Sequence, residues 1–151
     1  TNYKDPAYYN NTNSTYTFAD GQVTESWGTA TPKRLNDENA VDEDGNNLLD
    51  ADGNQVINYG LKTEKKRIVK QQASGLLAPT DWYVVKASEV ADYSVPSNIT
   101  TFRADVRTKS NEMETQIDAC TNVDELKALY EYTEQEDGTR TRPLAEFPEE
   151  I

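Results

Sequence analysis

The first 60 residues of this 151-residue chain contain almost no periodic pattern of apolar side chains. Neither the alternation of a strand nor the three-to-four spacing of a helix continues there beyond a few residues. Such a segment buries too little apolar surface to offset the ordering of its backbone, which costs about 1–2 kcal/mol per residue. If this segment is ordered, neighbouring subunits must order it. We therefore expect the chain to act within an assembly, as a homo-oligomer or in several copies.

Residues 1–40 are predicted to form an extended N-terminal arm with a short hairpin. The first 18 residues are mostly Asn, Thr, Tyr and Ser, which have low helix propensity. Apolar residues on both sides of Asp20-Gly21 predict a hairpin with its turn there. Tyr and Trp are suited to lying on a partner, and a poorly ordered polar terminus is the alternative. The partner-contact candidates in this arm are Tyr3, Tyr8, Tyr9 and Trp27.

Residues 41–132 are predicted to form an α+β core that begins with a β-hairpin. Two Asp-x-Asp-Gly-Asn-like sequences follow one another, beginning at Asp42 and Asp50. The second predicts a β-hairpin in which Leu48–Asp50 pairs with Gln55–Asn58. Next, the sequence predicts a helix over Lys62–Ser74 that Gly75 caps, and a strand over Thr80–Lys86 that Trp82 anchors to the helices.

The strongest periodicity predicts a long helix that begins near Ser97 after Pro96. Its apolar face comprises Ile99, Phe102, Val106, Met113, Ile117 and Cys120. A second helix is expected after Thr121, with Val123, Leu126, Leu129 and Tyr130 on its apolar face. Together these two helices predict a helical hairpin packed with the short β-hairpins. Residues 133–151 are expected to form a C-terminal hairpin around Gly138 and an extended tail, in which Phe147 is a further partner-contact candidate.

The composition excludes several classes of function. The chain has no His and one Cys, so it has neither a His-dependent nucleophile nor an intramolecular disulfide. A net charge of −12 argues against nucleic-acid binding, and no run approaches the ~20 apolar residues that span a membrane. We also find no secretory leader, and Thr1 is expected to be the residue exposed by removal of an initiator Met from a complete protein.

No sequence motif marks an active site. Nucleotide-binding and nucleophile-elbow motifs are missing, and among 27 carboxylates any close pair is expected by chance. The aspartate cluster at residues 42–52 fails the calcium-loop pattern in both possible registers, so turn formation is favoured over a cation site. We therefore expect a non-enzymatic protein without a metal or cofactor.

Charge is divided unevenly along the chain. Residues 61–110 carry a net +4 between two acidic segments, of −7 over 36–60 and −9 over 111–151. This division favours pairing within the chain or between subunits. The basic run is interpreted as a solvated helix face, and docking of an acidic neighbour is the alternative. It comprises Lys62, Lys65, Lys66, Arg67 and Lys70.

One short motif suggests a family. Leu76-Leu77-x-x-Thr80-Asp81-Trp82 precedes a Pro-headed helix that contains Phe102-Arg103 and Arg107, in which the two arginines are expected to bracket Asp81 and Asp105. Over about residues 45–132 the sequence resembles the short module of bacteriophage tail-assembly chaperones and tail-fibre-assembly proteins.

The resemblance implies a role in the phage tail with other phage proteins as partners. The N-terminal arm and the longer helical hairpin extend beyond the module. They favour a virion structural protein of a marine, contractile-tailed phage, assembled in the host cytoplasm and held in the tail, baseplate or fibre-attachment region. A chaperone that leaves after fibre assembly is the alternative, and a carbohydrate-active or cation-dependent receptor-binding module is a third class.

Overall fold

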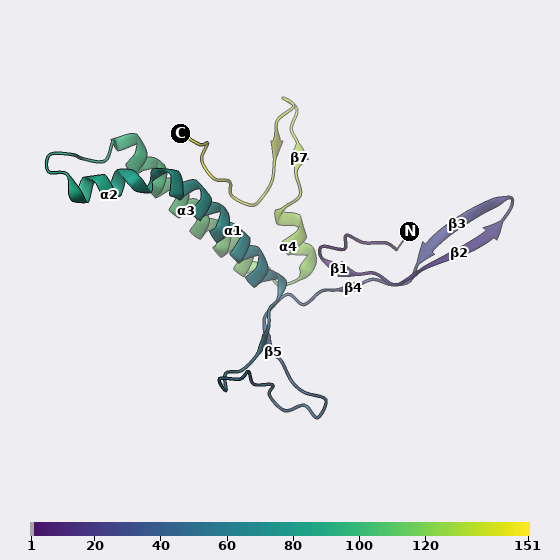
Figure 1. Ribbon diagram of the computed structural model, residues 1–151. Helices are drawn as coiled ribbons and strands as arrows, with labels where there is room; N and C mark the ends of the chain where they lie inside the picture. Colours follow the sequence, from purple (N-terminus) through teal and green to yellow (C-terminus); the bar gives the residue numbers. More distant parts are fainter. Residues whose placement is uncertain (1) are drawn as a thin grey trace. The chain divides into compact units, whose positions relative to one another are not determined.

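The computed structural model describes residues 2–151 and shows an α+β fold, which confirms the predicted class (Figure 1). The strands are β1 (Tyr9–Asn10), β2 (Ser14–Ala19), β3 (Gln22–Trp27), β4 (Thr31–Pro32), β5 (Glu38–Asn39), β6 (Ile57–Asn58), β7 (Thr133–Glu134) and β8 (Arg140–Thr141). The helices are α1 (Leu61–Leu77), the 3-10 turn η1 (Ala78–Thr80), α2 (Asp81–Glu89), α3 (Ser97–Ala119) and α4 (Val123–Leu129).

The chain divides into two compact units. The first contains the chain up to Thr63 together with Asn122–Lys127, and the second contains Glu64–Thr121 together with Ala128–Ile151. These bounds differ from the three segments expected from the sequence, because α4 contributes residues to the first unit although it lies far along the chain.

The β2–β3 hairpin of the first unit has the predicted turn. Ala19 pairs with Gln22, and Asp20 and Gly21 between them have φ values of 51° and 76°. Two successive positive φ angles match the twist of a tight antiparallel hairpin. Neither strand contains a buried residue, although Phe18 and Val23 lie opposite each other. The hairpin is therefore held by its own ladder and cross-strand pairs.

The start of α1 is fixed by the segment that precedes β5. The backbone N–H groups of Leu61 and Lys62 donate to the carbonyls of Arg34 and Leu35 at 2.9 and 3.1 Å. Asp37 accepts hydrogen bonds from the Gly60 N–H and the Thr63 hydroxyl at 2.8 and 2.9 Å. These bonds satisfy helix N–H groups that have no partner within the helix.

The core of the second unit lies between α1 and α3, which run antiparallel along each other (Figure 1). Phe102 and Val106 of α3 pack on Ala73 of α1. The predicted apolar face of α3 is confirmed, since its buried residues include Ile99, Phe102, Val106, Met113 and Ile117. The main helical partner of α3 in this unit is α1, whereas α4, the second helix of the predicted hairpin, is only 7 residues long.

Two predictions between residues 74 and 89 were wrong. Gly75 does not end α1, which continues to Leu77. The segment Thr80–Lys86 is not a strand: η1 ends at Thr80, and α2 covers Asp81–Glu89. A short apolar run fits a helix as well as a strand, and Asp81 stabilises the first turn of α2 through its charge. Consequently Trp82 does not anchor a strand to the helices, and its side chain is 52% exposed.

The C-terminal segment includes the predicted hairpin, with Thr133 opposite Thr141 and Gly138 in its turn at φ 81°. Beyond it the tail packs on its own chain. The Gln116 side chain donates to the Pro143 carbonyl at 2.9 Å and accepts from the Ala145 N–H at 2.8 Å. Leu144 is buried, and Phe147 packs against the α1–α3 cluster. The expectation that Phe147 contacts a partner is therefore corrected, because this ring covers the chain's own core.

Candidate functional site

The residues of the family-like motif come together around Arg103. Its guanidinium Nη1 donates to the Leu77 carbonyl at 3.1 Å and to the Thr80 hydroxyl at 2.5 Å. The same nitrogen lies 2.8 Å from the Asp81 carboxylate. Arg103 is 9% exposed, so its charge needs these partners to remain buried. The predicted Arg103–Asp81 pair is confirmed.

The other motif residues support this cluster or lie outside it. Leu76, Leu77 and Phe102 pack in the α1–α3 core. Arg107 donates from Nη1 to the Arg103 carbonyl at 3.2 Å, and no ion pair with Asp105 occurs among the described residues. Trp82 stacks near Tyr83, with ring centroids 3.8 Å apart, and faces solvent. The motif therefore determines the change of chain direction between α1 and α2, and Arg103 stabilises this change through its bonds.

Tyr8 and Tyr9 are buried within the first unit, so their assignment as partner contacts is corrected. The Tyr9 hydroxyl donates to the Asp124 carboxylate, and the Lys4 ammonium lies 4.2 Å from the Tyr9 ring centroid. The hydrogen bond to Asp124, with burial and the carboxylate charge adding to it, raises the pKa of Tyr9 to about 12. Tyr9 thus fastens the arm to α4.

Tyr3 and Trp27 remain candidates for contact with a partner. Their ring centroids lie 5.1 Å apart, and the Asn2 side chain donates to the Trp27 carbonyl at 3.2 Å. Tyr3 is exposed and Trp27 is half-buried. The arm thus presents one aromatic pair that its own chain covers incompletely.

The basic run of α1 pairs largely with acidic residues of its own unit. Lys66 lies 2.8 Å from Asp118 and Lys70 lies 3.2 Å from Glu114, while Arg67 lies 3.1 Å from Glu64. The Lys65 ammonium lies over the Tyr130 ring. The remaining member, Lys62, belongs to the first unit. The ion pairs of Lys66 and Lys70 thus join the basic helix α1 to acidic residues of α3, so the uneven charge along the sequence is partly paired within the chain.

Residues 38–58 form a three-way junction of backbone hydrogen bonds. The Ala40 N–H donates to the Val56 carbonyl at 2.8 Å, the Val56 N–H to the Leu48 carbonyl at 2.9 Å, and the Leu48 N–H to the Ala40 carbonyl at 2.9 Å. These three residues are eight positions apart, which is the spacing of the sequence repeat. The three arms of the junction are the β5–β6 ladder and two turns. The second turn is the predicted one, with Leu49 opposite Gln55, but the predicted hairpin was wrong beyond Val56, because Ile57 and Asn58 pair with Asn39 and Glu38 of β5.

The Gln55 side chain lies at the centre of the junction. Its Nε2 atom is within hydrogen-bond distance of the carbonyls of Ala40, Leu48 and Val56, at 2.9, 3.2 and 2.8 Å. An amide nitrogen has two protons, so the three carbonyls share them. This arrangement brings together carbonyl oxygens from all three arms.

The two turns contain the same internal hydrogen bonds, and these bonds explain why each turn begins with an aspartate. Asp42 accepts from the N–H groups of Asp44 and Asn46 at 3.0 and 2.8 Å, and Asp50 accepts from Asp52 and Asn54 at 2.9 and 2.8 Å. The backbone hydrogen bond from Asn46 is the main cause that lowers the pKa of Asp42, and the bond from Asn54 is the main cause for Asp50. Gly45 and Gly53 both have φ 82°. Within residues 2–151 no carboxylate cluster has the arrangement of a metal site.

Sequence reasoning missed the side chains that organise these regions. Gln55, Gln116 and Asp124 each bond across many residues, and an isolated polar side chain has no pattern that reveals such a contact. The eight-residue repeat was a usable signal for the junction, because equal spacing brings equivalent residues to equivalent places.

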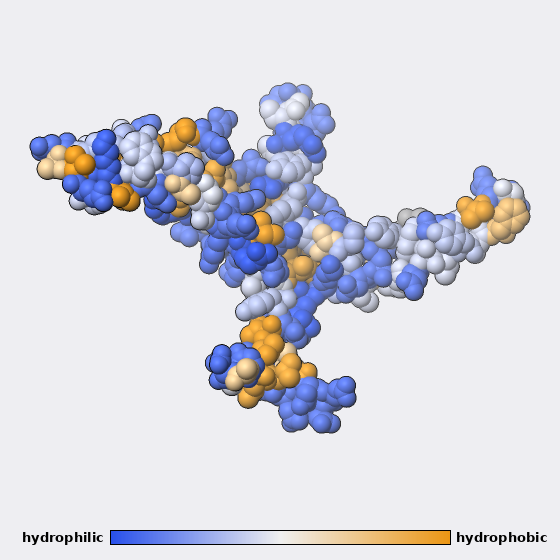
Figure 2. All heavy atoms as spheres, in the orientation of Figure 1, coloured by the Kyte–Doolittle hydropathy of each residue, from blue (hydrophilic) through white to orange (hydrophobic). Residues whose placement is uncertain are grey.

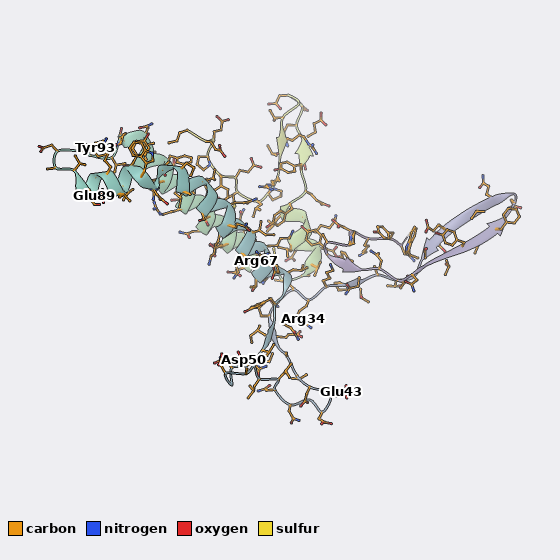
Figure 3. The ribbon with its side chains drawn as sticks, in the orientation of Figure 1. Arg34, Glu43, Asp50, Arg67, Glu89 and Tyr93 are labelled. Carbon is orange, nitrogen blue, oxygen red and sulfur yellow. The ribbon has the colours of Figure 1, made fainter. Side chains whose placement is uncertain are left out.

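Figure 3 labels Arg34, which precedes β5, and Glu43 and Asp50, which mark the two turns of the junction. None of the helices within residues 2–151 has the length and apolar character of a membrane span. In the comparisons with known proteins, no family model matches the sequence, and no curated protein or solved structure matches it.

Proposed function

We propose that this chain is a non-enzymatic structural protein of a bacteriophage virion, located in the tail, baseplate or fibre-attachment region. Its role is to hold neighbouring subunits through surface contacts. The supporting motif is the Leu-Leu…Thr-Asp-Trp…Phe-Arg pattern, whose Arg103 is bonded to Leu77, Thr80 and Asp81.

The observation that carries this proposal is the amount of exposed surface. The chain exposes 10555 Å². Two separate compact domains that share its mass equally would expose only about 9,300 Å² by the usual scaling of surface with mass. Elements without a buried residue, such as β2–β3 and α2, contribute to this surface. Subunits that fold fully only in an assembly have this property.

Mass spectrometry of purified virions tests the proposal. A structural protein is present at a fixed ratio to the other virion proteins and remains after the particles are washed at high salt. Its absence from virions, together with its presence in infected cells, would overturn the structural role. A density map of the particle then gives the position and the copy number.

The alternative is a tail-fibre assembly chaperone that is not retained in the virion. The observation that favours it is α2, which has no buried residue and exposes Trp82, Val84 and Val85. A transient client site needs apolar surface of this kind. Under this alternative the protein co-purifies with unassembled fibre protein and is missing from mature particles.

A further inference from the structure

The three-way junction exposes aliphatic side chains at equivalent positions of its repeat. Val41 and Leu49 each stand directly before the first aspartate of a turn, and they are 54% and 55% exposed. Leu48 is also exposed, and Figure 2 shows hydrophobic side chains gathered on the part of the molecule that carries β5. Full burial of one such side chain yields about 1.5–3 kcal/mol, so this surface is poised to gain free energy when covered.

The fold of the junction does not use these side chains. Backbone bonds among Ala40, Leu48 and Val56 hold its centre, with the Gln55 amide on their carbonyls. Asp42 and Asp50 hold the turns. The exposed side chains of Val41 and Leu49 take no part in these bonds, so replacing them leaves the bonds of the junction in place.

Charge around the aliphatic side chains selects the partner. Residues 36–60 contain seven carboxylates and no Lys or Arg. The carboxylates of Glu43, Asp44 and Asp52 lie in the two turns and accept no side-chain hydrogen bond from any residue that the structure describes. Interfaces that combine an apolar centre with a charged rim bind surfaces of complementary charge. The complement of this junction is apolar at its centre and cationic at its rim.

We propose that the three-way junction is a docking surface for a cationic segment of another protein, one that carries aliphatic side chains between its Lys or Arg residues. The inference rests on the proposed function, because it gives the chemistry of one neighbour in the assembly. A second copy of this chain fits poorly, since both copies carry a net charge of −12 and the basic run of α1 is engaged with Glu64, Glu114 and Asp118.

The test uses the full chain and three fluorescein-labelled synthetic octapeptides. One alternates Leu with Lys, one replaces Leu by Ser, and one replaces Lys by Glu. By fluorescence anisotropy, the Leu-Lys peptide binds at least about tenfold more tightly than either of the others, since both the aliphatic and the cationic side chains contribute. Equal binding of the Ser-Lys peptide would mean that net charge alone is responsible, and would overturn the proposal.

Two matched pairs of variants locate the site. V41T/L49T weakens binding of the Leu-Lys peptide about tenfold, whereas F18S/V23T removes exposed apolar side chains from β2–β3 and has no effect. E43Q/D44N/D52N weakens binding about tenfold more than E89Q/D92N/E136Q, which removes the same charge elsewhere. Amide hydrogen exchange of Ala40, Leu48 and Val56 verifies that the junction is intact in each variant.

Three further results would overturn the inference while leaving the proposed function standing. These are unchanged binding in both junction variants, equal losses in junction and control variants, and a dimer of the parent chain that V41T/L49T converts to a monomer in sedimentation. The last result would make a second copy the occupant. Conversely, absence from virions removes the proposed function and leaves the peptide measurement unaffected.

Discussion

Arg103 shows how a single residue determines the path of the chain between two helices. It lies on α3, yet its bonds go to the end of α1, to η1 and to the start of α2. A buried guanidinium needs several hydrogen-bond acceptors to replace the water that it gives up. Arg103 has three, a carbonyl, a hydroxyl and a carboxylate. The arginine thus sets the corner at which Trp82 and the rest of α2 begin.

Replacement of Arg103 by Ala is expected to lower the free energy of unfolding by about 2–4 kcal/mol, because buried acceptors lose their donor. Asp81→Asn is expected to cost less than about 1 kcal/mol, since the Asp81 side chain is largely exposed. Denaturant unfolding followed by circular dichroism measures both values. Equal effects of the two changes would show that the ion pair, and not the bonds to Leu77 and Thr80, dominates.

Tyr9 makes stability depend on pH at the alkaline end. Its folded-state pKa is about 12, above the ordinary tyrosine value of 10.0. A raised pKa of a phenol favours the neutral form, so the stabilisation is fully present below pH 10 and is lost as the pH rises through 12. We expect thermal stability to fall between these pH values and Tyr9→Phe to reduce that fall. The same slope in both proteins would contradict this role.

At the scale of elements, local chemistry predicted the turns and missed how distant elements pair. Asp20-Gly21 and the Asp-Gly turns of residues 42–54 determine their hairpins within a few residues, so the sequence alone was sufficient there. The pairing of α3 with α1 depends on contacts between residues such as Lys66 and Asp118, more than 50 positions apart. The strand predicted over 80–86 failed because Val84 and Val85 favour strands only where a neighbouring strand is available.

The junction depends on the Gln55 amide. Gln55→Leu removes a donor that three carbonyls share, and Gln55→Glu places a carboxylate against those carbonyls. Both changes should lower the protection of the Ala40, Leu48 and Val56 amides against hydrogen exchange. The loss of protection should be larger for Gln55→Glu. Asn47 occupies the equivalent position of the first repeat but is exposed, and Asn47→Leu serves as the control. Unchanged protection in both Gln55 variants would assign the stability of the junction to its backbone bonds alone.

Helix α1 contains a position at which a substitution should stabilise the protein. Gly75 lies within the helix, and apart from its chain neighbours and the adjacent helix backbone no atom lies within 4 Å of the place that a Cβ would occupy. Gly75→Ala should therefore raise the free energy of unfolding by about 0.5–1 kcal/mol, through the lower entropy of the unfolded chain. The measurement is the shift of the denaturation midpoint. Destabilisation would indicate that α1 ends near Gly75 in solution, as the sequence first predicted.

At the scale of the whole molecule, the low apolar content is unevenly distributed between an ordinary core and the other segments. The core between α1 and α3 resembles that of any globular protein, with Met113 and Ile117 fully buried. The aromatic candidates Tyr8, Tyr9 and Phe147 belong to packing within the chain, which sequence could not reveal because a tyrosine or phenylalanine in a polar segment looks the same in both roles. Tyr3, Trp27 and the junction remain candidates for contact with neighbouring subunits.

The C-terminal tail is expected to contribute to global stability. Leu144→Ala should cost about 2–4 kcal/mol, as for other buried leucines, since this side chain is 2% exposed. E149Q/E150Q should stay within about 0.5 kcal/mol of the parent, as surface changes usually do. Denaturant unfolding of the full chain compares the three proteins. A negligible effect of Leu144→Ala would mean that the tail detaches in solution and is available to neighbours.

The eight-residue spacing of the junction has a consequence for how the chain tolerates insertions and deletions. Removal of residues 42–49 would bring Val41 directly before Asp50, so that Ala40 and Val56 face each other across one plain hairpin with every donor and acceptor still matched. A deletion of any other length would shift the register and leave backbone groups unpaired. Length variation in related chains should therefore occur here in whole repeats, each of which adds or removes one arm.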